Sequence, residues 1–195
     1  TNPERNMKPK GLLVAIAAPS GTGKTTVCHE LMKRDDRFVF SVSCTTRPPR
    51  PNERDGVDYH FISREQFLKN IHEGKMAEWQ EIFGNYYGTL KDSIEQALRD
   101  GKILLLDLDV KGTLNLKKNY PEQLICIFLL PPSDTELDRR LQKRGTDDSS
   151  SIAIRKARIP DELELSEQFD FQIVNDNLEA TVNKIINMIE EHLKK

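Results

Sequence analysis

Apolar residues in this chain gather into short unbroken runs, separated by segments with helical periodicity. Four runs are rich in branched side chains and do not alternate with polar residues: LLVAIA at 12–17, ILLLDLD at 103–109, LICIFLL at 124–130 and FDFQIV at 169–174. Such runs are typical of parallel strands that are buried on both faces. Because helices must then cover both faces, the pattern predicts an α/β fold with a doubly wound, mainly parallel five-stranded sheet flanked by helices.

Capping signals mark the helices that connect these runs. Capping-box spacing relates Ser63 to Gln66 and Ser133 to Glu136, which predicts helix starts at both places. Helix stops are predicted at Gly74, Gly101 and Gly145. The last helix places five apolar residues on one face, which we expect to pack on the sheet rather than on a partner. They are Val182, Ile185, Ile186, Ile189 and Leu193.

Residues 41–96 have a different pattern and predict an inserted, mixed α+β subdomain. Short strand-like pieces, FSVSC at 40–44, YHFI at 59–62 and NYYGTL at 85–90, surround one helix and a loop rich in Pro and Arg. The rest of the core then spans about 11–40, 97–132 and 166–195, and residues 1–10 are expected to form a disordered leader. With 195 residues the chain is long enough for one domain with a substantial core.

Composition excludes several classes of protein. A formal net charge of −2, with 31% charged residues, gives no general attraction to nucleic acid or to an anionic membrane. No apolar run approaches the roughly 20 residues of a transmembrane helix, and the four histidines lack the spacing of a zinc site. Three cysteines without a CxxC pair indicate reduced thiols in a cytoplasmic protein. We expect them to be small buried residues, with Cys44 as the exception.

The segment APSGTGKTT at 18–26 is typical of a phosphate-binding loop, because it joins an apolar strand to a helix. Gly21 and Gly23 would let backbone N–H groups curl around phosphates, and the helix N-terminus adds partial positive charge. Lys24 would bridge the β- and γ-phosphates, and Thr25 would offer its hydroxyl to Mg²⁺. The alternative is a flexible glycine loop with a solvated lysine. Ala18 replaces the first glycine of the motif, which is tolerable if its φ is negative.

Acidic and basic residues elsewhere suit phosphoryl transfer. Asp107 and Asp109 follow an apolar strand and, at period 2, point to the same side, where they could share a cleft with the metal; a simple turn or helix cap remains open. Arg47 and Arg50 lie on a proline-stiffened loop. A second group, Arg140, Arg144 and Arg155, lies further along the chain. Any one arginine could be merely solvated, but two groups beside a phosphate loop indicate two phosphate-bearing substrates.

The sequence resembles the guanylate kinase family over residues 11–193, with the family's motifs in order and at its spacing. They are APSGTGKTT, FSVSCTTRPPRPNERDGVDYHFIS, AEWQEIFGNYYGT, ILLLDLDVKG, IFLLPPS and RLQKRGTDDSSSIAIRK. The resemblance implies a fold of the P-loop NTPase type, with GMP bound by the inserted subdomain and a helical lid over about 133–165. It implies Mg²⁺-dependent transfer of the ATP γ-phosphoryl group to GMP, and it names ATP and GMP as small-molecule partners.

The resemblance also implies the site residues. The GMP site would comprise Ser43, Arg47, Arg50, Tyr59, Glu78, Tyr87, Thr89 and Asp109, with Glu78 and Asp109 reading the guanine. The ATP site would comprise Ala18, Pro19, Ser20, Gly21, Thr22, Gly23, Lys24, Thr25, Thr26, Arg140, Arg144 and Asn175. The catalytic residues would be Lys24, Arg47, Arg140 and Arg155. Thr25 and Asp107 would hold the metal.

Some points stay open at this level. Pro160 interrupts a stretch that is a continuous helix in relatives, so a helix restart is expected near Asp161. Tyr59 and Tyr87 could serve ordinary aromatic packing, as we expect for Tyr86. The chain could instead be a kinase for another nucleoside monophosphate, or a guanylate-kinase-like scaffold domain that binds phosphopeptides. Monomer and homodimer are both compatible with the sequence.

Overall fold

The computed structural model describes residues 10–19, 21–132 and 161–195, and these ranges contain a five-stranded parallel sheet. Its strand order is β2–β7–β1–β8–β9, and every pair of neighbours is parallel. The strands are β1 (Leu12–Ala17), β2 (Phe38–Phe40), β7 (Ile103–Asp107), β8 (Leu124–Leu130) and β9 (Phe171–Val174). The predicted doubly wound fold is confirmed. The apolar runs at 103–109 and 169–174 are longer than the strands that they form, β7 and β9.

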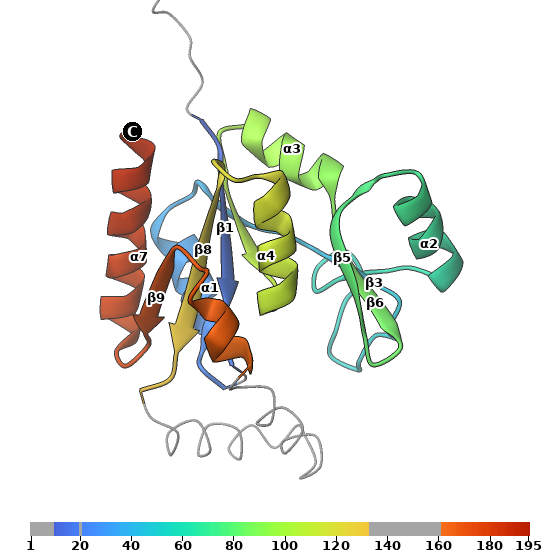
Figure 1. Ribbon diagram of the computed structural model, residues 1–195, viewed down its shortest axis with the longest axis horizontal. Coiled ribbons are helices and arrows are strands. Elements are labelled where there is room, and N and C mark those ends of the chain that lie inside the picture. Colours follow the sequence, from blue (N-terminus) through green and yellow to red (C-terminus); the bar gives the residue numbers. More distant parts are fainter. Residues whose placement is uncertain (1–9, 20, 133–160) are drawn as a thin grey trace, which may run out of the picture.

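Helices cover both faces of this sheet, as its unbroken apolar strands require. Leu12, Val14 and Ile16 face a cluster that includes apolar residues of α1 (Lys24–Arg34) and α7 (Leu178–Leu193). The alternate residues of β1 face a second cluster, which includes apolar residues of α3 (Lys91–Arg99) and α4 (Val110–Asn119). Figure 1 shows α7 at one side of the molecule, with α3 and α4 between the central strands and the inserted subdomain.

The inserted subdomain has its own four-stranded sheet, in the order β4–β3–β6–β5. Its strands are β3 (Cys44–Thr45), β4 (His60–Phe61), β5 (Met76–Ile82) and β6 (Asn85–Leu90), and α2 (Arg64–His72) packs on it. A separate apolar cluster holds it together: Cys44, Phe67, Met76 and Tyr86. The sheet is mixed, because β3 is parallel to β4 but antiparallel to β6.

The prediction of FSVSC as one strand-like piece is wrong. Phe40 ends β2 in the central sheet and Cys44 begins β3 in the second sheet, so residues 41–43 connect the two. The backbone N–H of Ser41 still donates to Leu105 O at 2.8 Å, and His60 N donates to Ser43 O at 2.8 Å. The chain therefore crosses between the sheets in three residues, too few for a long flexible linker.

Several predicted helix ends are confirmed. The Ser63 hydroxyl accepts a hydrogen bond from Gln66 N at 3.0 Å at the start of α2. Gly74 and Gly101 follow the ends of α2 and α3, each with φ of +69°. The apolar face of α7 packs on the sheet as expected. Residues 161–166 are helical, whereas Ser133, Glu136, Gly145 and Pro160 lie outside the described ranges.

All three cysteines are buried, so the expectation that Cys44 differs is wrong. Its side chain packs in the apolar cluster of the inserted subdomain and is 2% exposed. Burial raises the pKa of Cys44 to about 11, so the thiol is protonated at neutral pH. Among the described residues, no helix combines the length and apolar character that crossing a membrane requires.

Candidate functional site

A tight loop leaves β1 and opens directly into α1. Gly21 and Gly23 have φ of +83° and +93°, a region in which a side chain would be strained, and α1 begins at Lys24. Ala18 is not among the described residues with positive φ, as its methyl group requires. The Thr22 hydroxyl donates to Pro19 O at 2.7 Å and closes the loop. Such a turn is suited to bind an anion, because its N–H groups and the helix N-terminus converge.

Lys24 pairs with Asp107, the last residue of β7, through its Nζ and Asp107 Oδ1. Asp107 reaches the loop because it lies opposite Ile16 in the register of β1 and β7. Burial would lower the pKa of Lys24, but the Asp107 carboxylate offsets this and leaves the pKa above its ordinary value. The lysine is therefore charged at neutral pH. Thr25 and Thr26 are exposed on the first turn of α1.

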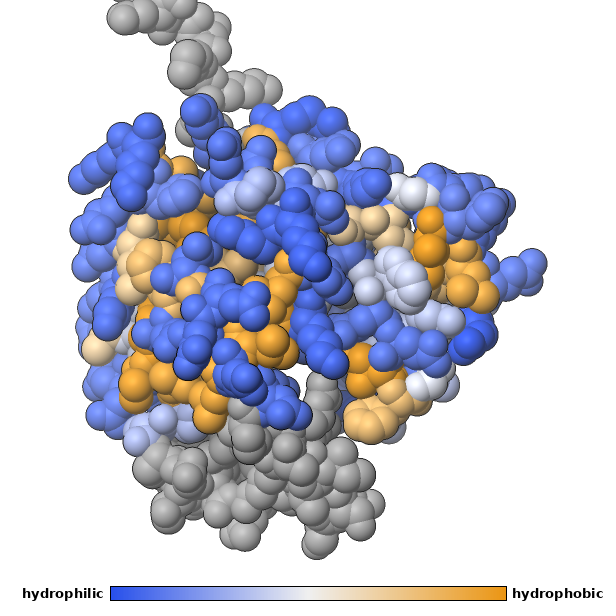
Figure 2. Space-filling model, viewed as in Figure 1, coloured by the Kyte–Doolittle hydropathy of each residue, from blue (hydrophilic) through white to orange (hydrophobic). Residues whose placement is uncertain are grey.

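A cleft of about 180 Å³ lies where the inserted subdomain meets the core. Figure 2 shows the surface hollowed between these two parts of the molecule. Its lining comes from strands of both sheets and from residues that adjoin these strands: Ser43, Tyr59, Glu78, Gln80, Ile82, Tyr87, Gly88, Asp107, Leu108 and Asp109. The structure thus brings together five of the eight residues expected at the GMP site, and Asp107 with them.

Glu78 is the most deeply buried acid in this cleft, at 6% exposure. It lies on β5, where period-2 alternation also turns Gln80 and Ile82 toward the cleft. The Thr89 hydroxyl donates to Glu78 Oε1 at 2.9 Å, and Thr89 itself is fully buried behind it. Burial raises the pKa of Glu78 to about 7, helped by the nearby Asp109 charge and opposed by the Thr89 hydrogen bond.

Asp109 is the N-cap residue of α4, and its carboxylate accepts from Gly112 N at 2.8 Å and from Gln80 Nε2. Asp109 is thus a helix cap, which the sequence had left open, and it also lines the cleft. A Cβ atom on Gly112 would lie 2.9 Å from Asp109 Oδ1, 3.1 Å from Glu78 Oε2 and 3.2 Å from Gln80 Nε2. The absence of a side chain at 112 therefore lets these three polar groups converge.

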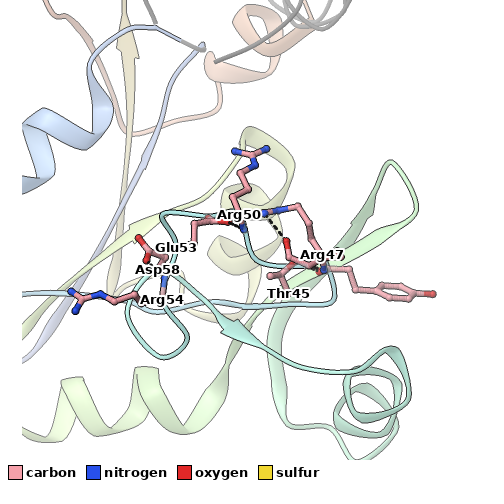
Figure 3. A network of polar contacts seen from close by, with 8 residues as sticks. Thr45, Arg47, Arg50, Glu53, Arg54 and Asp58 are labelled. Atoms are coloured by element: carbon pink, nitrogen blue, oxygen red, sulfur yellow. Dashed lines mark hydrogen bonds and ion pairs between the residues drawn. The ribbon is translucent and has the colours of Figure 1, made fainter. Parts of the chain in front are cut away.

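Arg47 and Arg50 do not line the cleft in this structure. Arg47 donates to both carboxylate oxygens of Glu53, at 2.8 and 2.9 Å, and stacks over the Tyr59 ring. Glu53 also accepts from Arg50 N at 2.8 Å, while the Arg50 side chain extends away from it (Figure 3). The hydrogen bonds from Arg47 hold the pKa of Glu53 below its usual range. The loop therefore presents one paired and one exposed guanidinium.

Asn175, which the resemblance places near the adenine, directly follows β9 and is 6% exposed. Its Nδ2 donates to Thr22 O at 2.7 Å, so its carboxamide contacts the phosphate loop. The remaining expected residues, Ser20, Arg140, Arg144 and Arg155, lie outside the described ranges.

Sequence reasoning missed two residues of this site. Gln80 lines the cleft and bonds Asp109, and the alternation of Glu78 with Gln80 would have indicated it once β5 was recognised as a strand. Glu53 holds Arg47, but the sequence offers no signal that selects it among the three acidic residues of RPNERDGVD as the partner.

Fold and site together define a P-loop protein of the nucleoside monophosphate kinase class, with a phosphate loop on the central strand and a second cleft under an inserted sheet. Comparison with known proteins narrows this class. The family model for guanylate kinase matches residues 10–192, and the chain belongs to the guanylate kinase family.

Individual members of this family are similar to the chain over nearly its whole length. The chain is 48% identical over 184 residues to a guanylate kinase of Chlorobaculum tepidum, which covers 94% of both chains. It is 42% identical over 186 residues to one of Thermotoga maritima, covering 95% of this chain and 89% of the relative. A crystal structure of guanylate kinase from Anaplasma phagocytophilum superposes with a TM-score of 0.78 at 31% identity, covering 96% of this chain and 89% of that one.

Proposed function

We propose that the chain carries out the guanylate kinase reaction, transfer of the ATP γ-phosphoryl group to GMP, with ATP at the 18–26 loop and GMP in the cleft between the sheets. The observation that carries this proposal is the position of Asp107 between the two sites. It lines the cleft and also pairs with Lys24 of the phosphate loop, so the two sites adjoin at one carboxylate. Two nucleotides bound there would meet with their phosphates at Lys24.

The cleft has the chemistry to select guanine. An ionised Glu78 accepts two hydrogen bonds, and the guanine N1–H and 2-amino group present two adjacent donors. Adenine offers no such pair of donors on that edge. We assign Glu78 and Asp109 to the base, and Ser43, Tyr59 and Tyr87 to the phosphate end together with Arg47 and Arg50. Thr89 acts through Glu78, because its hydroxyl bonds that carboxylate from behind.

No general base is needed in this reaction, because the attacking GMP phosphate oxygen is already anionic at neutral pH. Catalysis then reduces to alignment of the two phosphates and neutralisation of their charge, which falls to Lys24 and the arginines. The expected lid arginines, Arg140, Arg144 and Arg155, remain part of the proposal. The three buried thiols suit a reducing compartment, and we propose a cytoplasmic location.

Mg²⁺ belongs to the proposal as well. Thr25 is exposed beside the loop and Asp107 is 38% exposed at its edge, so two oxygen ligands are available from the protein. This set fits Mg²⁺, which is usually bound by one or two protein oxygens together with substrate phosphates and water. When bound, the ion would neutralise charge on the transferring phosphoryl group.

A panel of acceptors tests the proposal. ADP release, measured with a coupled assay and ATP–Mg²⁺ as donor, is expected with GMP and dGMP and not with AMP, CMP or UMP. Turnover of AMP above GMP would assign the chain to another monophosphate. Absence of turnover together with absence of ATP binding in calorimetry would favour the phosphopeptide-binding alternative.

A further inference from the structure

One buried chain of hydrogen bonds links α7 to the phosphate loop. The Thr181 hydroxyl, on the first turns of α7, donates to Asn175 Oδ1 at 2.9 Å. The Asn175 amide then donates to Thr22 O at 2.7 Å, and Asn175 N donates to Leu130 O at 2.8 Å. Thr181 and Asn175 are 3% and 6% exposed, so water does not substitute readily for these contacts.

Contact with the loop is close as well as polar. A Cβ atom on Gly23 would lie 2.9 Å from Asn175 Nδ2, so the carboxamide lies directly against the glycine backbone. The Thr22 carbonyl and the Gly23 N–H belong to one trans peptide and point in opposite directions. Because Asn175 binds the carbonyl, it turns the Gly23 N–H away from itself. That N–H is one of the donors that a phosphate-binding loop presents to its ligand.

Thr22 and Thr181 each satisfy one end of the Asn175 amide. An amide offers an oxygen acceptor at one side and an NH₂ donor at the other. The Thr22 carbonyl only accepts, so the NH₂ group must face it, and the Thr181 hydroxyl then donates to Oδ1 and holds the carboxamide in that position. Without that hydroxyl, Oδ1 would be left unpaired in a buried position. Flipping the amide would not help, because it would place Oδ1 against the Thr22 carbonyl oxygen.

We propose that Thr181 is a positioning residue for ATP binding: through Asn175, its hydroxyl holds the Thr22–Gly23 peptide in the orientation that binds phosphate. The inference rests on the proposed function only in taking residues 18–26 as the ATP site. Thr181 contacts no nucleotide in this scheme, and its effect on ATP passes through Asn175 and the loop.

Three variants test the proposal: Thr181→Val removes the hydroxyl at nearly constant shape, Thr181→Ser keeps it, and Asn177→Ala is the matched control. Asn177 caps the same helix, since its Oδ1 accepts from Ala180 N at 2.9 Å, but its side chain is exposed and lies outside the Thr181–Asn175–Thr22 chain of hydrogen bonds. Loss of a buried hydrogen bond predicts that Thr181→Val raises KM for ATP about tenfold. KM for GMP should change by less than about twofold, because the cleft is untouched.

Two further readouts separate positioning from general destabilisation. Amide hydrogen exchange at Gly23 and Lys24 should be faster in Thr181→Val, and Thr181→Ser should restore both exchange and KM. Asn177→Ala should lower the melting temperature without changing KM for ATP. If Thr181→Val does not fold, Thr181→Ala replaces it under the same expectations. Unchanged KM for ATP in the hydroxyl-free variant, or an equal rise in Asn177→Ala, would overturn the proposal.

The role of Thr181 can be tested without the phosphoryl acceptor, GMP. The dissociation constant of ATP–Mg²⁺ is measured by calorimetry without GMP, alongside hydrogen exchange. If the wild-type protein binds ATP but does not phosphorylate GMP, the proposed function fails while the role of Thr181 is still decided by these two measurements.

Discussion

Binding of guanine should depend on pH through Glu78. Burial raises the pKa of this carboxyl to about 7 in the ligand-free protein, so near neutrality about half of the molecules carry it protonated. A protonated carboxyl has lost part of the acceptor capacity that the N1–H and 2-amino group require. Affinity should therefore follow the ionised fraction, and guanosine should bind about tenfold more weakly at pH 6 than at pH 8.

Guanosine is the right probe because it lacks the phosphate of GMP, which itself titrates near pH 6. Calorimetry in two buffers of different ionisation enthalpy should show release of about half a proton per ligand at pH 7. Glu78→Gln keeps the shape and an acceptor for the Thr89 hydroxyl, so it should bind guanosine more weakly and lose this pH dependence. Equal affinity at pH 6 and 8, or an unchanged slope in Glu78→Gln, would refute the role of the carboxyl.

The raised pKa of Glu78 also implies that the stability of the folded protein depends on pH. A carboxyl whose pKa is raised in the folded state stabilises the protein below its ordinary pKa, 4.5, and this contribution is lost as pH rises through about 7. The loss amounts to about 3 kcal/mol at pH 8. Glu78→Gln should therefore be more stable than the wild type toward urea at pH 8, and the difference should shrink toward pH 5. If Glu78→Gln were less stable than the wild type at pH 8, burial of the ionised Glu78 carboxylate would not destabilise the folded protein.

Three substitutions test other parts of the molecule. Lys24→Met should lower kcat by orders of magnitude in the coupled assay. Its melting temperature should stay close to that of the wild type, since the Asp107 side chain is 38% exposed and water can solvate it. A near-normal kcat would remove Lys24 from the mechanism. Glu53→Ala should raise KM for GMP about tenfold and leave KM for ATP unchanged, because Arg47 and the loop lose the carboxylate that orders them; a lower KM for GMP would mean that Glu53 competes with the phosphate. Ile185→Ala, at a fully buried position, should lower the free energy of unfolding by about 3 kcal/mol in urea titrations with both KM values unchanged; a loss under about 1 kcal/mol would place Ile185 outside the core.

The central sheet could be predicted because its strands are buried on both faces, which leaves an unbroken apolar run such as LLVAIA. β5 could not, because neither of its faces is uniformly apolar: Glu78 and Gln80 face the cleft, while Trp79 and Glu81 are exposed on the other side. The split of FSVSC between two sheets was likewise hidden, since local propensity does not say with which partner a strand pairs.

The site residues could be named from motifs, but their pairing could not. Asp107 and Lys24 are distant in sequence and meet only because β1 and β7 are neighbours in register. The partner of Arg47 depends on how its loop folds back on Glu53, and the depth of Glu78 depends on packing of the inserted sheet against α4. These features are tertiary, and no local pattern in the chain encodes them separately.

The three cysteines divide among the three apolar clusters of the molecule. Cys28 lies with α1 and α7, Cys126 lies on the opposite side of the central sheet, and Cys44 lies in the inserted subdomain. Burial raises their pKa values to about 12, about 12 and about 11, so a thiol reagent at neutral pH reacts only after a cluster opens. Site-resolved labelling rates would thus report three local opening free energies from one unmodified chain. The natural sequence already carries a separate probe for the unfolding of each part.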